Sequence, residues 1–118
     1  MQISPRFNAD NNTKPLRPEL TGYHAYFQPI GLVNEHGILV AHKFEALCRR
    51  TDGVPPGIFL PELERSGKIR YLDLLMFEES CIFLNHLNTP RHCKISVNAH
   101  AHTLFSDGIL EETRSILD

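Results

Sequence analysis

The sequence has no long hydrophobic run and no large excess of charge of either sign. No stretch approaches the roughly 18 apolar residues that a membrane-spanning helix needs, and the amino-terminal residues contain no apolar run resembling a signal peptide. Twelve Lys and Arg residues against 14 Asp and Glu residues give a formal net charge of −2. Without a basic excess, electrostatics gives no reason to propose DNA or RNA as a partner. We therefore expect a cytoplasmic protein that binds neither membranes nor nucleic acids.

Cysteine is scarce as well. The three cysteines, Cys48, Cys81 and Cys93, are widely spaced and form no Cys-x-x-Cys pair. An odd number at this spacing favours reduced, buried thiols over disulfides or a zinc knuckle.

The length of 118 residues is enough for one domain. Residues 1–22 are rich in asparagine, proline and charge, which predicts a mobile amino-terminal tail. The folded domain is expected to span residues 23–118.

The first half of the domain predicts a β-hairpin. Residues 24–33 and 38–50 are strand candidates, and the turn sequence "NEHG" at 34–37 separates them. Pro29 lacks a backbone N–H and therefore predicts an edge, a strand end or a bulge. In the second strand Lys43, Glu45 and Arg49 share one face, which suits either a solvated surface or the floor of a binding site.

The second half alternates helix and strand. Residues 59–67 predict a short helix with Pro61 in its first turn and Gly67 at its end, and residues 68–87 predict a longer helix. Its expected core-facing residues are Ile69, Leu72, Met76, Ile82, Phe83 and Leu87. A short buried strand at 93–99 and another helix, capped by Ser106 or Asp107, follow. This order predicts an α/β fold with a largely parallel sheet.

In such a sheet, Glu45, Arg49 and Asn98 would lie at the carboxyl ends of the strands, where ligands gather. Carboxylate and amide oxygens suit Mg²⁺ or Mn²⁺, and a guanidinium suits phosphate. Each residue alone is a weak signal, because a single glutamate on a strand is more often solvated.

Five separated motifs resemble the opening part of the bacterial EAL domain. They are "YFQPI", "FEALCR", "IFLPELERSGKI", "YLDLLMFEESC" and "ISVNAH", in the order and at about the spacing of that family. The Glu-Ala-Leu that names the family is Glu45-Ala46-Leu47 here, and the resemblance extends from Tyr26 to about Asp118.

The resemblance implies a (β/α)₈ barrel that hydrolyses cyclic di-GMP to the linear dinucleotide with Mg²⁺ or Mn²⁺. By motif position, Glu45 and Asn98 would be metal ligands, Arg49 would contact a phosphate, and Gln28 would lie near the dinucleotide. Paired cations would polarise the phosphodiester and deprotonate the attacking water.

Several parts of the family pattern are absent from the sequence. A barrel of this type needs roughly 200 to 250 residues, and the motifs here account for the first hairpin and about one and a half βα units of an incomplete TIM-type barrel. The family's Glu-Leu-Thr-Glu, its Asp-Asp-Phe-Gly-Thr-Gly loop and its catalytic lysine do not occur. No catalytic set is therefore complete in this chain, and we expect a truncated EAL protein without hydrolytic activity that binds cyclic di-GMP weakly at most. The alternative is a non-catalytic protein-interaction regulator derived from an EAL domain.

Two further residues, Lys43 and His100, depart from the family. Lys43 replaces a usual glycine and could pair with Glu45 in place of a cation or simply point to solvent. His100 replaces a small or hydroxyl residue, and an extended strand would align Asn98, His100 and His102 as a transition-metal site. Lone histidine pairs are more often surface or hydrogen-bonded residues.

An unfinished barrel also leaves a sheet edge open. We expect Val40, Leu47, Ile95 and Val97 to lack their opposite wall. Self-association or a protein partner that covers the edge is the predicted consequence.

Overall fold

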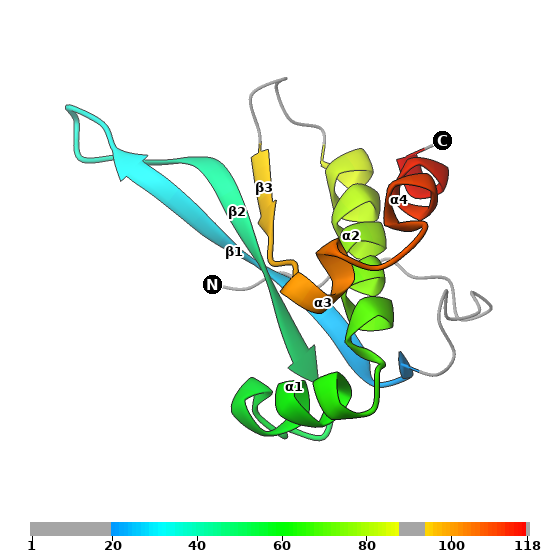
Figure 1. The fold of residues 1–118 in the computed structure, drawn as a ribbon. Coiled ribbons are helices and arrows are strands. Elements are labelled where there is room, and N and C mark those ends of the chain that lie inside the picture. Colours follow the sequence, from blue (N-terminus) through cyan, green and yellow to red (C-terminus); the bar gives the residue numbers. More distant parts are fainter. Residues whose placement is uncertain (1–19, 88–93, 118) are drawn as a thin grey trace.

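A computed structural model describes residues 20–87 and 94–117, which form a three-stranded sheet with helices (Figure 1). The elements in chain order are β1 (Tyr23–Val33), β2 (Leu39–Arg50), α1 (Pro56–Arg65), α2 (Ile69–His86), β3 (Lys94–Val97), α3 (Ala101–Leu104) and α4 (Ile109–Leu117). The strand order is β1-β2-β3, with β1 antiparallel to β2 and β2 parallel to β3.

The mixed α/β class is confirmed. Residues 1–19 of the expected tail and Cys93 lie outside the described residues, and Leu20 is buried in the core.

The predicted hairpin is confirmed and has a turn built on Asn34. The Oδ1 atom of Asn34 accepts hydrogen bonds from the backbone N–H groups of His36 and Ile38, both at 2.9 Å. Gly37 adopts a φ of 74°, a backbone conformation that residues other than glycine rarely take. Pro29 lies on the edge strand β1, and a bulge between Ile30 and Gly31 follows it. Figure 1 shows the hairpin extending well beyond β3.

Helix α1 starts earlier than predicted. It begins at Pro56, which supplies the proline of the first turn, and Pro61 lies inside the helix with its ring exposed. The predicted end is right: Lys68 N–H bonds the Leu63 carbonyl at 2.8 Å, and Gly67 has a φ of 75°. This bond satisfies one of the carbonyls that the end of a helix leaves free.

Helix α2 packs lengthwise on one face of the sheet. The Phe83 ring stacks on Phe27 with centroids 4.0 Å apart and meets the edge of Phe44 at 5.2 Å. Ala25 and Ala46 are fully buried on the same face, and their small side chains allow close approach of helix and sheet. Ile82, which we expected in the core, is instead 38 % exposed because it lies on the outer side of α2.

The short strand β3 shows which face of the sheet is apolar. Its residues Ile95 and Val97 are level with Phe44 and Ala46 of β2 and pack against the core beneath α2. The expectation that Ile95 and Val97 would lack a packing partner is therefore wrong. β3 is also only partly buried and shorter than predicted, because the chain turns after Val97.

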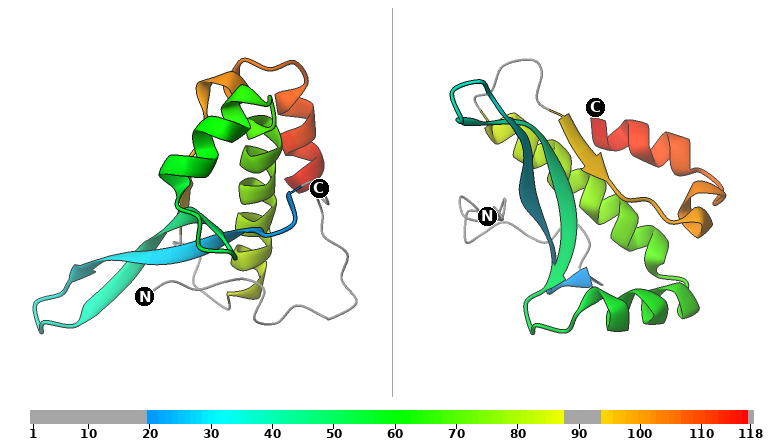
Figure 2. Two further views of the ribbon diagram at one scale, coloured as in Figure 1. Left: turned by 90° about the horizontal axis from the view of Figure 1, so that it is seen from below. Right: turned by 90° about the vertical axis from the view of Figure 1, so that its left-hand side faces the viewer.

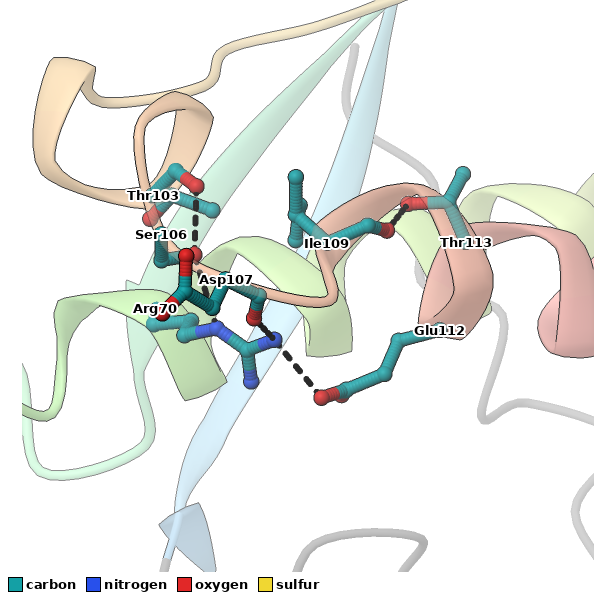
Figure 3. A network of polar contacts seen from close by, with 7 residues as sticks. All are labelled: Arg70, Thr103, Ser106, Asp107, Ile109, Glu112 and Thr113. Carbon is teal, nitrogen blue, oxygen red and sulfur yellow. Dashed lines mark hydrogen bonds and ion pairs between the residues drawn. The ribbon is translucent and has the colours of Figure 1, made fainter.

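Arg70 of α2 connects the main body to the last helix. Its Nε donates to the Ser106 hydroxyl at 2.8 Å, and its Nη2 donates to the Asp107 carbonyl at 3.1 Å and to Glu112 at 2.6 Å (Figure 3). Ser106 in turn donates to the Thr103 carbonyl at 2.6 Å, so it stabilises the α3 end instead of capping α4, which starts only at Ile109. Figure 2 shows α4 beside α2, where this network holds it.

Candidate functional site

The face of the sheet opposite α2 carries polar side chains. Residues alternate along a strand, so those that point away from Phe27 and Phe44 share this second face. We call it the polar face after its polar members Gln28, Lys43, Glu45, Arg49, Lys94 and Ser96; Tyr26, Ile30 and Leu47 lie on the same face. The alternating charge of β2 therefore lies on the side of the sheet away from the aromatic core.

Gln28 and Glu45 lie directly opposite each other on this face. They are register partners on β1 and β2, and Ser96 is the partner of Glu45 on β3. Glu45 is half-buried, whereas Gln28 is exposed. These three side chains form one polar row across all three strands.

Arg49 and Asn98 meet at the carboxyl ends of β2 and β3. Both border a cavity of about 280 Å³, together with Asp73 and His100. Arg49 Nη1 donates to the Cys48 carbonyl at 2.8 Å, and no other residue among 20–87 and 94–117 accepts a hydrogen bond from its guanidinium. Glu45 does not border this cavity, although Ala46 and Leu47 do. Along the strand, Glu45 lies about 13 Å from Arg49.

Glu45 and Asn98 are the candidate metal ligands. Glu45 is level with Ser96, two residues before Asn98. One carboxylate and one amide oxygen are too few for a two-metal centre. Among residues 20–87 and 94–117, no three His, Cys, Asp or Glu side chains lie together in a way that could hold a metal ion. The donors present therefore do not fit the metal centre that the sequence motifs imply.

Lys43 points to solvent. It is exposed, and within the described part of the chain no ion pair joins it to Glu45. Of the two readings of this lysine, the structure agrees with the exposed one.

A buried carboxylate on α2 holds the loop after β3. The Asp73 Oδ2 atom accepts the backbone N–H of His100 at 2.9 Å, and Oδ1 lies 2.9 Å from the His100 Nδ1 atom. The sequence reasoning missed Asp73; the available signal was a charged residue within the apolar run Leu72–Met76, where a carboxylate needs a partner.

The proposed alignment of Asn98, His100 and His102 is not formed. β3 ends at Val97, and His100 is the residue that precedes α3. His102 is exposed within α3. The histidines therefore belong to a helix start, and strand alternation does not apply to them.

Cys48 also borders the cavity, but burial keeps it protonated. Desolvation, with a smaller contribution from the negative charge of Glu79, raises the pKa of the Cys48 thiol to about 12. Cys48 and Cys81 are both free cysteines. A thiol with such a pKa is neither a nucleophile nor a ready metal ligand near neutral pH.

Across the described ranges, 20–87 and 94–117, the longest helices are still too short or too polar to cross a bilayer. Comparison with curated proteins and with solved structures gave no significant match. The family model described as "EAL domain" matches residues 17–118, almost the whole chain and every residue of the polar face. The chain therefore belongs to the EAL domain family, a family of cyclic di-GMP signalling whose members depend in general on metal ions.

Proposed function

We propose that this chain binds cyclic di-GMP weakly on the polar face and does not hydrolyse it. The observation that carries the proposal is the position of Arg49 and Asn98 on one cavity at the carboxyl ends of β2 and β3. The Gln28–Glu45 pair lies on the same face of the sheet as Arg49, further along the strands. A ligand about the size of a dinucleotide could contact both places.

Arg49 is the proposed phosphate contact. A guanidinium presents planar, forked donors that match two phosphate oxygens, and a charged donor forms a stronger bond than a neutral one. Gln28 would contact the same ligand from β1 through its amide.

Glu45 and Asn98 occupy the positions of the family's Mg²⁺ or Mn²⁺ ligands. Two oxygen donors do not build a paired metal site. Asp73 and His100, which border the cavity beside Arg49, are bonded to each other. In architecture, we propose that the sheet and helices correspond to the first hairpin and first βα units of a (β/α)₈ barrel. The observed order of antiparallel hairpin, helix and parallel strand supports this.

The hydrolysis claim is tested with the purified 118-residue chain, cyclic di-GMP and either Mg²⁺ or Mn²⁺, with separation of the nucleotides by chromatography. We expect no linear dinucleotide above the rate of a protein-free control. Product that forms with the wild-type chain and disappears with Glu45→Ala would overturn the proposal, because it would require a site completed between chains.

A second candidate function is that of a protein-interaction regulator. It is favoured by the apolar side chains of Leu104, Phe105 and Leu110, which α3 and α4 expose, with Phe105 at 88 %. An isolated patch of this kind often marks a protein contact. An interaction abolished by Phe105→Ser and unaffected by Arg49→Ala would favour this function over nucleotide binding.

A further inference from the structure

Two lysines lie side by side on the polar face. Lys43 of β2 and Lys94 of β3 are register partners in the parallel pair, so their backbones are about 4.8 Å apart. Both side chains are exposed, and no ion pair in the described part of the chain involves either of them. The chain thus places two positive charges on neighbouring strands, with no ion-pair partner for either among residues 20–87 and 94–117.

Like charges directly across neighbouring strands destabilise a sheet. An anion between the two ammonium groups would remove this repulsion and would be attracted by both. The polar face as a whole carries three cationic residues, Lys43, Arg49 and Lys94, against the single carboxylate of Glu45. This face is therefore basic on a chain whose formal net charge is −2.

The same charges act against a divalent cation at Glu45. Glu45 lies two residues from Lys43 on the same face, about 7 Å along the strand, and its partner Ser96 lies two residues from Lys94. A unit positive charge at about 7 Å from a divalent cation weakens cation binding roughly five- to tenfold even at the dielectric constant of water. Two such lysines would multiply the effect.

We propose that Lys43 and Lys94 take the place of a metal ion on the polar face. Their ammonium groups bind phosphate oxygens of an anionic ligand directly, and they lower the affinity of Glu45 for divalent cations. The identification of the ligand as a cyclic dinucleotide rests on the proposed function, whereas the effect on cation binding does not. Binding at this face is therefore independent of added metal.

The first measurement uses Mn²⁺ alone, titrated into the wild-type chain and into a Lys43→Ala/Lys94→Ala variant, with free Mn²⁺ read by electron paramagnetic resonance. We expect the double variant to bind Mn²⁺ at least about tenfold more tightly than the wild-type chain. Lys68→Ala removes one exposed positive charge next to α2 and away from the polar face, and should leave the affinity unchanged. Equal affinity in wild type and double variant, or no binding by either, would overturn the proposal.

The second measurement titrates cyclic di-GMP into the same proteins in the presence of EDTA. We expect the wild-type chain to bind and the double variant to bind at least about fivefold more weakly. Binding that requires added metal, or that is unchanged in the double variant, would overturn the anion part of the proposal. If no protein binds cyclic di-GMP under any condition, the proposed function fails, and the Mn²⁺ titration still decides the cation part. Circular dichroism of each variant verifies that these exposed substitutions leave the fold intact.

Discussion

Asp73 of α2 binds His100 with both carboxylate oxygens, one to the backbone N–H and one to ring Nδ1, each at 2.9 Å. The side chain of Asp73 is buried, and the two residues are 27 positions apart. This contact ties the segment after β3 to α2, and Asn98 of that segment borders the same cavity as Arg49.

Replacing Asp73 tests the importance of this contact. We expect Asp73→Ala to lower the free energy of unfolding by about 2 to 3 kcal/mol, since it leaves the His100 N–H without its charged acceptor. His100→Ser keeps the backbone bond and should cost only about 1 kcal/mol. Urea unfolding monitored by circular dichroism compares the two. Equal losses would show that the backbone bond contributes nothing.

Arg70 should control the attachment of α4. No α4 residue is fully buried, and Arg70 binds Glu112 of this helix together with Ser106 and Asp107 just before it. We expect Arg70→Ala to speed amide hydrogen exchange in α4 about tenfold while α2 exchanges little faster. Arg114→Ala, an exposed substitution on α4 itself, serves as the matched control. Unchanged exchange in the Arg70 variant would mean that packing alone holds α4.

The raised pKa of the Cys48 thiol predicts that the folded chain loses stability at alkaline pH. Burial raises its pKa from 9.0 to about 12, so the folded state keeps the proton over a range in which the unfolded state has lost it. Stability from this thiol is complete below pH 9 and is lost as the pH rises from about 9 towards 12. At pH 10 we expect a loss of about 1 kcal/mol that is absent in Cys48→Ala. Chemical denaturation at pH 8 and pH 10 measures it, and equal losses in both proteins would refute the assignment.

Local chemistry explains which elements the sequence predicted. The hairpin was predictable because strand alternation, Asn34 and Gly37 act over a few residues, and the same holds for the end of α1 at Gly67. The predicted start of α1 was wrong because either Pro56 or Pro61 would be acceptable in the first turn of a helix, and the helix begins at Pro56. Helix α3, a single turn after β3, was not predicted, since four residues carry too little periodicity.

The site was predictable only in part, because its geometry depends on contacts between distant segments. Strand alternation grouped Glu45 with Arg49, but the face of Ile95 and Val97 depends on the register with β2, which one sequence does not define. The partner of Asp73 could not be found for the same reason. Motif order, in contrast, identified the family, because the match extends over residues 17–118.

The open edge of β3 predicts self-association. In the described part of the chain, β3 pairs with β2 on one side, and its other side has no neighbouring strand. On the opposite edge of the sheet, β1 donates its Ala25 N–H to Glu79 of α2. We expect sedimentation velocity at micromolar concentrations to show a dimer or larger species whose fraction rises with concentration. Phe105→Ser should leave this species intact if the edge forms the contact. A strictly monomeric chain with a cooperative thermal transition would contradict the prediction, and loss of the dimer in Phe105→Ser would move the contact to the helices.

The central claim is that the polar face binds cyclic di-GMP through Arg49. The most direct measurement is a calorimetric titration of cyclic di-GMP into the wild-type chain, into Arg49→Lys and into Arg65→Lys as a matched control on the exposed end of α1. We predict weak binding to the wild-type chain and to Arg65→Lys, and at least about tenfold weaker binding to Arg49→Lys, because an ammonium keeps the charge but loses the forked contact. Equal affinity of the wild-type and Arg49→Lys proteins, or no binding to the wild-type chain at millimolar ligand, would contradict the account.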